Sequence, residues 1–108
     1  MAESIQVQLR KGALDLCVLA VLSRRESYGY EIASTLVAAV GMGEGTIYPL
    51  MRRMQKDGLV ATHLVESSSG PPRKYYRLTE RGQQVFEIYR RDWRSFTGAV
   101  DQLLEELS

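Results

Sequence analysis

A change in the spacing of apolar residues near the middle of this 108-residue chain most constrains how it can fold. Before Asp57-Gly58, apolar residues recur three and four positions apart, as they do on one face of an α-helix. From Leu59 to Glu66, and again over "RKYYRL", apolar and polar residues alternate, which is typical of short β-strands. The intervening "SSSGPP", Ser67 to Pro72, is too long for the tightest hairpin turn and predicts a projecting loop.

Two helices are predicted in the first 41 residues. One extends from about Val7 to Leu22 and contains the apolar run "LDLCVLAVL", so we expect it to be buried on most sides. After a break at residues 27–29, a second helix ends at Gly41, because glycine commonly terminates helices. The inward residues of this second helix are expected to be Ile32, Leu36, Val37 and Val40.

A third helix is expected within "GEGTIYPLMRRMQKDGLV", residues 43–60. It follows "GMGEG", a connection of the length found in helix-turn-helix units. Pro49 has no N–H, so either the helix begins near Gly45 or Thr46 or its first turn is irregular. In both cases, free N–H groups are expected between Gly45 and Ile47, and these favour phosphate. Its inward stripe is Ile47, Leu50, Met51 and Met54, and its outward residues are Tyr48, Arg52, Gln55 and Lys56.

The order helix, helix, helix, strand, loop, strand, helix predicts a winged helix-turn-helix, a mainly α fold with a small two-stranded β wing. Residues 1–81 are expected to form its DNA-binding domain and residues 82–108 a long C-terminal dimerisation helix. The third helix of this fold normally enters the major groove, which gives its outward basic residues a role that core packing does not explain.

Charge and composition narrow the class of protein. The formal net charge is only +1, but residues 45–81 hold seven Lys/Arg against three Asp/Glu, so this part is suited to an anion. One cysteine, Cys17, and one histidine, His63, exclude an internal disulfide and offer no metal-ligand spacing, so we expect no metal and no cofactor. No run is apolar enough for a membrane span and the start lacks a signal-peptide pattern, so a cytoplasmic protein is expected.

The last helix carries a heptad seam, with apolar residues at alternating intervals of three and four over about three heptads. The seam residues are Phe86, Tyr89, Trp93, Phe96, Val100, Leu103 and Leu107. A helix of this length exceeds what so small a domain needs for its own core, so a homodimer is expected. In the alternative, packing against the first helix takes up part of the seam and the protein is a monomer.

Three segments resemble the signature segments of the PadR family of transcriptional regulators, in the same order and at the same separations. They are "YGYEIASTL", residues 28–36, "GEGTIYPLMRRMQKDGLV", and "GPPRKYYRLTERG", residues 70–82. Trp93 also lies where many short members place a tryptophan, and the resemblance covers nearly the whole chain. It implies a short-form homodimeric DNA-binding protein, usually a repressor, that releases its operator when a small effector binds or the dimer geometry changes.

The resemblance also implies which residues contact DNA. Thr46, Tyr48, Pro49 and Arg52 would lie at the DNA-facing end of the recognition helix, with Lys56 on the same outward side as Arg52. The remaining implied DNA contacts are Tyr30 on the phosphate backbone, and Arg73 and Lys74 at the base of the wing.

Neighbouring residues refine these roles. Alternate side chains of a strand point to opposite faces, so one of Arg73 and Lys74 should face DNA at a time. Arg53 is expected to pair with a carboxylate such as Asp57, one turn further on. The wing tip, "SSSG", is short of charge, so little reading of DNA sequence is expected there.

Trp93 suggests an effector site. In a symmetric dimer its two copies could sandwich a flat aromatic molecule, or they could simply form part of the seam. The residues expected to line this site are Ala13, Leu16, Cys17, Trp93 and Phe96. Asp92 and Asp101 nearby would favour a cationic ligand, or they are merely solvated.

The expected partners are a pseudo-palindromic double-stranded DNA operator, a second copy of the chain and a small aromatic effector. The alternative function is a winged-helix module for protein–protein interaction without DNA, which the near-neutral net charge allows. The chain contains no nucleophile motif, so an enzyme is not expected.

Overall fold

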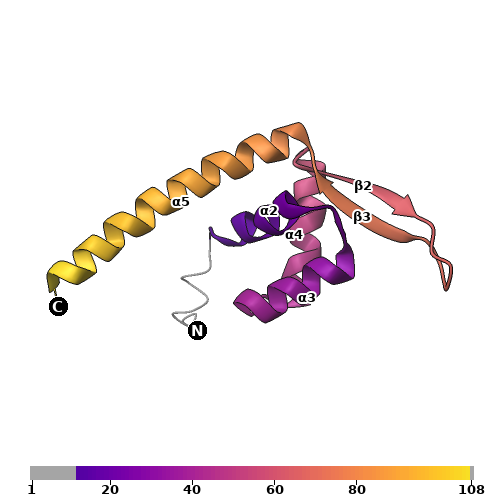
Figure 1. The fold of residues 1–108 in the computed structure, drawn as a ribbon, viewed down its shortest axis with the longest axis horizontal. Helices are drawn as coiled ribbons and strands as arrows, with labels where there is room; N and C mark the ends of the chain where they lie inside the picture. The colour runs from indigo at the N-terminus through magenta and orange to yellow at the C-terminus, as the bar shows by residue number, and fades with distance from the viewer. Residues whose placement is uncertain (1–11, 108) are drawn as a thin grey trace.

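A computed structural model describes residues 12–107, with side chains to residue 106. Its elements are α2 (Leu14–Arg24), β1 (Ser27–Tyr28), α3 (Gly29–Val40), α4 (Glu44–Lys56), β2 (Val60–Val65), β3 (Arg73–Leu78) and α5 (Glu80–Leu107). Helices α2, α3 and α4 form a body from which the β2–β3 hairpin projects on one side, while α5 extends away on the other (Figure 1). The molecule is therefore elongated, 57 × 33 × 22 Å, and the predicted winged helix-turn-helix with a long last helix is confirmed.

One core joins the three helices of the body to the base of the wing and the start of α5. Its buried residues are Val18, Leu19, Leu22, Ile32, Ala33, Leu36, Met42, Ile47, Leu50, Met51, Met54, Val60, Tyr76 and Phe86. The inward stripe predicted for α4 is confirmed, since its four members are all buried. Because the four stripe residues of α4 recur one, three and four positions apart, they cover one side of the helix and leave the opposite side to solvent.

Helix α2 differs from its prediction in both extent and burial. It begins at Leu14, because Gly12 has a left-handed φ of 83° and the chain turns there, so the expected helix from Val7 does not continue through this point. Residues 7–11 lie outside the described part of the chain. The helix is also not buried on most sides: Val18 and Leu19 are fully buried, whereas Cys17 is half-buried, because only one side of α2 faces the core.

Helix α3 ends where the sequence predicts. Gly41 adopts a left-handed φ of 66° and its N–H donates to the carbonyl of Val37 at 3.0 Å. The predicted burial of Val37 is wrong, because this side chain is 46 % exposed and Ala33 occupies the inward face instead. Ala33 lies about 100° around the helix from Ile32 and marks one edge of the buried face. Val37 lies beyond this edge.

Helix α4 begins slightly before the expected position, with Pro49 inside it. The N–H groups of Thr46 and Ile47 donate to the carbonyl of Gly43 at 2.9 and 3.1 Å, so the expectation that these two groups are free is wrong. Pro49 has no N–H with which to continue the hydrogen-bond ladder to Gly45.

The wing belongs to a three-stranded antiparallel sheet with the order β1-β3-β2. The predicted β2–β3 hairpin is confirmed, and β1 is a short additional strand at the predicted break between α2 and α3. Tyr76 is paired with Ser27 on β1 and with Thr62 on β2, and we call the face of the sheet that carries these three residues the inner face. The inner face packs on α4, where the Gln55 amide donates a hydrogen bond of 3.3 Å to the Thr62 hydroxyl. The opposite, outer face carries Tyr75 and the two residues paired with it, Tyr28 and His63.

The start of α5 is fixed by a compact set of hydrogen bonds. The Thr79 hydroxyl accepts from the N–H of Gly82 at 3.0 Å and donates to the carbonyl of Gly58 at 2.6 Å, so Thr79 caps the helix. The N–H of Thr79 donates to the carbonyl of Leu59 at 3.1 Å. Phe86 then enters the core, so the position of α5 relative to the body is set within its first two turns.

Within residues 12–107, no helix is both long enough and apolar enough to cross a membrane. The same residues contain no group of three His, Cys, Asp or Glu side chains that could hold a metal ion.

Candidate nucleic-acid interface

The side of α4 opposite its buried stripe forms an exposed ridge. The α4 ridge consists of Gly45, Pro49, Arg52 and Lys56, all exposed and separated by four, three and four positions. Tyr48 lies beside the ridge on the flank near the sheet and is half-buried against the core.

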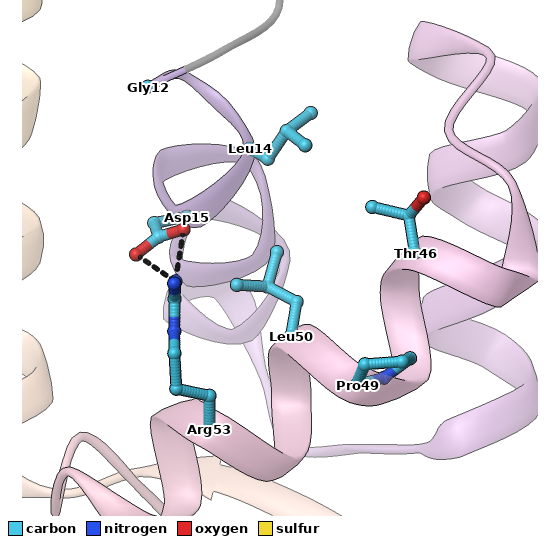
Figure 2. Close-up of a pocket in the computed structure, with 7 residues that line it drawn as sticks. All are labelled: Gly12, Leu14, Asp15, Thr46, Pro49, Leu50 and Arg53. Carbon is cyan, nitrogen blue, oxygen red and sulfur yellow. Dashed lines mark hydrogen bonds and ion pairs between the residues drawn. The ribbon is translucent and has the colours of Figure 1, made fainter.

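Arg53 lies on the other flank of α4 and is held by α2. Its Nη2 atom is 2.7 and 2.8 Å from the two carboxylate oxygens of Asp15 (Figure 2). The expected pairing with Asp57 is wrong, because the Arg53 side chain points sideways toward the first turn of α2. Exposed ion pairs contribute only about 0.2–1 kcal/mol, so this contact chiefly orients the two helices and leaves Arg52 as the arginine of the ridge.

The Arg53–Asp15 pair borders a hollow of about 470 Å³ between α2 and α4. The hollow is lined by Gly12, Leu14, Asp15, Thr46, Pro49, Leu50 and Arg53 (Figure 2). Thr46 and Pro49, two of the predicted DNA contacts, therefore lie at the boundary between the α4 ridge and the start of α2.

Lys74 lies on the inner face of the wing, on the same side as α4. Its Nζ is 5.7 Å from the centre of the Tyr76 ring, which lies against the core. Burial raises the pKa of the Tyr76 hydroxyl, Tyr48 raises it further and Arg52 lowers it, so both α4 residues lie near this ring. Lys74 and Arg52 thus reach solvent on the same side of the molecule, and Tyr76 remains neutral near pH 7.

Arg73 lies on the outer face, as the alternation of strand residues requires. Its guanidinium carbon is 4.7 Å from the centre of the Tyr28 ring, which in turn lies 6.4 Å from the ring of Tyr30 and 5.6 Å from that of Tyr75. Tyr30 is 65 % exposed at the start of α3. Arg73 and Tyr30 therefore both lie against Tyr28, whereas Lys74 lies on the side of the α4 ridge.

His63 continues this row of rings across the sheet. It lies 6.0 Å from the centre of the Tyr75 ring, and its Nε2 is 3.6 Å from the Glu26 carboxylate. Its side chain is exposed on β2.

The seam predicted for α5 divides into two parts. Phe86 is 8 % exposed and belongs to the core of its own protomer, so intramolecular packing takes up the first seam residue. Beyond it Tyr89, Trp93, Phe96 and Leu103 are 40 %, 44 %, 66 % and 61 % exposed, and Val100 is half-buried. The side chain of Leu107 lies outside the described residues. Leu104, which the seam did not include, is 60 % exposed.

A hollow of about 440 Å³ lies between α2 and α5. It is lined by Leu16, Ala20, Ser23, Arg24, Phe86, Arg90, Trp93 and Arg94. Leu16 and Trp93 of the predicted effector lining are present, whereas Ala13, Cys17 and Phe96 lie elsewhere. Burial raises the pKa of the Cys17 thiol, which lowers its reactivity.

Sequence reasoning missed the three arginines of this hollow. Within residues 12–107, no ion pair joins Arg24, Arg90 or Arg94 to a carboxylate. The spacing of Arg90 and Arg94 by one helical turn was visible in the sequence, but the approach of Arg24 from α2 was not.

A helix-turn-helix body with a basic exposed ridge and an adjoining β wing defines the winged helix-turn-helix class of DNA-binding regulators. Residues 18–88 match the Transcriptional regulator PadR-like family, and the chain belongs to this family. The resemblance seen in the sequence is thereby confirmed: the protein is a DNA-binding transcriptional regulator, in a family of regulators and not of enzymes.

Solved structures share both the fold and the sequence pattern. A PadR-like transcriptional regulator from Bacillus cereus is 40 % identical, with 90 % of this chain and 96 % of that chain covered and a TM-score of 0.82. A PadR family transcription regulator from Clostridium difficile is 34 % identical over 86 % of this chain and 99 % of that one, with a TM-score of 0.79. An uncharacterized protein of Lysinibacillus sphaericus is 25 % identical over 107 residues, which cover 95 % of this chain and 98 % of that protein.

Proposed function

We propose that this regulator is a homodimeric repressor that binds a pseudo-palindromic operator. In this proposal the DNA-binding unit lies within residues 1–81, and the part of α5 (Glu80–Leu107) beyond residue 81 is the dimerisation helix. The observation that carries the proposal is that one continuous helix, α5, joins the DNA-binding unit rigidly to an exposed apolar seam. Two such units, placed about one turn of B-DNA apart, roughly 34 Å, would present two recognition helices to successive major grooves.

The α4 ridge and Lys74 supply the main contacts to DNA in this proposal. Arg52, Lys56 and Lys74 are exposed, and among the described residues none is paired with a carboxylate. Arg52 is placed to reach base edges or phosphates, and Lys56 and Lys74 to reach phosphates on either side of it. Thr46, Tyr48 and Pro49 shape the groove-facing end of α4.

Tyr30 and Arg73 form a second contact to the phosphate backbone. Each lies against the Tyr28 ring, whose centre is 4.7 Å from the Arg73 guanidinium carbon and 6.4 Å from the centre of the exposed Tyr30 ring. This arrangement suits one phosphate group near the start of α3.

A small aromatic effector would bind in the hollow between α2 and α5. Trp93 offers an aromatic surface, and Arg24, Arg90 and Arg94, which pair with no carboxylate of the described residues, favour an anionic ligand. The cationic ligand that Asp92 suggests is less favoured, because Asp92 lies 3.6 Å from Arg91. A ligand there would favour one angle between α2 and α5 and so alter the distance between the two recognition helices. Typical couplings of about 1–3 kcal/mol change affinity roughly 5- to 150-fold.

The test is binding of the purified protein to the DNA upstream of its own coding region at several salt concentrations. Arg52→Ala should weaken binding and reduce the slope of log affinity against log salt by about one, because a lost phosphate contact releases fewer counterions. Arg91→Ala removes the same charge from an exposed site on α5 and should leave the slope unchanged. Salt-insensitive or absent binding by the wild type, to this DNA and to random fragments, would instead favour the protein–protein interaction module.

Effector binding is tested separately with benzoate, a small aromatic anion. We expect benzoate to quench Trp93 fluorescence and to weaken operator binding, and Arg90→Ala to reduce both effects. Quenching that is unchanged in Arg90→Ala would place the ligand elsewhere.

A further inference from the structure

Leu64 is the most exposed of the large apolar side chains in the described part of the chain, at 70 %. It lies in the second half of β2, where the wing projects beyond the helical body (Figure 1). A single exposed leucine is ordinary on a protein surface, so its position decides whether it has a role.

The register of the sheet places Leu64 on the inner face. Leu64 is paired with Lys74, and residues directly opposite each other in an antiparallel pair share a face. The Lys74 side chain lies over the ring of Tyr76, which faces α4, so Leu64 lies on the side of the recognition helix.

Helix α4 does not cover this position. Gln55 of α4 hydrogen bonds to Thr62, and Leu64 lies two residues, about 6.6 Å, further toward the wing tip. The loop itself, residues 67–72, contains only Ser, Gly and Pro, and it is flanked by the exposed Glu66 and Arg73. Lys74 therefore has an apolar neighbour on the inner face, whereas Glu66 borders the same hollow as Arg73 and Tyr75 of the outer face.

We propose that Leu64 is an apolar DNA contact that rests against deoxyribose in the minor groove beside each half-site, while Lys74 holds the adjacent phosphate. The inference rests on the proposed DNA-binding mode, in which the inner face of the wing continues the surface of the α4 ridge. Minor-groove proteins commonly place apolar side chains against the sugars or between base steps, where no charge is required. Leu64 would thus make the wing sensitive to groove width without reading a base by hydrogen bonds.

An apolar contact and a phosphate contact respond differently to salt. Removing part of the Leu64 side chain should weaken operator binding about 3- to 10-fold, less than the more than tenfold loss expected for a fully buried leucine, because DNA would cover only part of this side chain. The salt slope should stay the same, because no counterion is released when an apolar group binds. Lys74→Ala should reduce the slope by about one.

The experiment compares Leu64→Ala with Val65→Ala, a matched control on the outer face of the same strand. Dissociation constants for the operator are measured by fluorescence anisotropy at several salt concentrations, with Lys74→Ala and Arg52→Ala in the same series. We expect Leu64→Ala alone to lose affinity at an unchanged slope, and Val65→Ala to bind as the wild type does. Circular dichroism checks that each variant is folded.

Two results would overturn the proposal. Either Leu64→Ala binds as tightly as Val65→Ala, or it lowers the salt slope as Lys74→Ala does, which would mean that it acts by displacing the lysine. If Arg52→Ala and Lys74→Ala also leave binding unchanged, the proposed DNA-binding mode fails, and this outcome is distinct from a failure at Leu64 alone.

Operator variants test the groove directly. Replacing A·T pairs beside the half-site by G·C adds an amino group to the minor groove, whereas inosine·cytosine pairs do not. The wild type should bind the A·T and inosine·cytosine operators equally and the G·C operator more weakly, and Leu64→Ala should discriminate less. Equal discrimination by both proteins would contradict a contact from Leu64 in this groove.

Discussion

Replacing Gly82 by alanine should destabilise the protein, although helix propensity alone predicts the opposite. Gly82 lies in the first turn of α5, and alanine in a helix is normally about 1 kcal/mol more favourable than glycine. A Cβ atom at Gly82, however, would overlap the carbonyl oxygen of Leu59 and lie 3.3 Å from Cδ2 of Leu78. The two effects therefore oppose each other at this one position.

The Leu59 carbonyl cannot move away cheaply. It accepts the N–H of Thr79 at 3.1 Å, and Thr79 is itself held by its hydroxyl contact of 2.6 Å with Gly58. Overpacking typically costs about 1–3 kcal/mol, and loss of one hydrogen bond about 0.5–1.5 kcal/mol. After the gain in propensity is subtracted, Gly82→Ala should lower the free energy of unfolding by about 2 kcal/mol, or roughly 8–16 °C in Tm for a domain of this size.

The assay is urea unfolding followed by circular dichroism, with all proteins at the same protomer concentration because dimerisation affects apparent stability. Gly98→Ala is the matched control in the same helix. Apart from the neighbouring backbone of its own helix, no atom of the described residues lies within 4 Å of the position of a Cβ at Gly98, so this variant should gain up to about 1 kcal/mol. If both variants are more stable than the wild type, the contact between Gly82 and Leu59 does not constrain the start of α5 and the reasoning is refuted.

Three further perturbations follow from the contacts described. Arg53→Met removes the ion pair with Asp15 and should lower the free energy of unfolding in urea by less than about 1 kcal/mol. The salt slope of DNA binding should stay unchanged, and a decrease of about one in this slope would instead assign Arg53 to a phosphate contact. Phe96→Ser should leave the protomer folded, because the Phe96 side chain is 66 % exposed in one protomer. It should raise the dimer dissociation constant, measured by sedimentation, at least about tenfold, and an unchanged constant would place the interface elsewhere. Burial raises the pKa of the Cys17 thiol and so lowers its thiolate fraction at pH 8. Iodoacetamide should therefore react more slowly with the folded protein than with the urea-unfolded one, and equal rates would contradict the burial of this thiol.

The sequence predicted those features that depend on near neighbours. The inward stripe of α4 follows from the spacing of Ile47, Leu50, Met51 and Met54, and the end of α3 follows from a glycine that can adopt a left-handed φ. The start of α5 was likewise predictable, because a threonine in front of a helix accepts one of its free N–H groups.

Features that depend on distant parts of the chain were not predictable from these patterns. Strand β1 has only two residues, too few for an alternating pattern, and it exists because β3 supplies its hydrogen bonds. Arg53 pairs with a residue 38 positions away rather than with a carboxylate one turn along its own helix. The placement of Arg73 and Lys74 beside different partners required the tertiary positions of Tyr28 and Tyr76.

Helix α5 continues without a break from its threonine cap, through Phe86 in the core, to the exposed Leu103. In the proposed dimer no linker separates the DNA-binding unit from the seam. The angle between the two DNA-binding units is therefore set by the direction in which the seam faces around the axis of α5. One residue inserted between Phe86 and Trp93 would rotate the rest of the seam by about 100° and advance it by about 1.5 Å, whereas seven would nearly restore the phase. The operator spacing that this protein accepts would then be set by the number of residues in one helix.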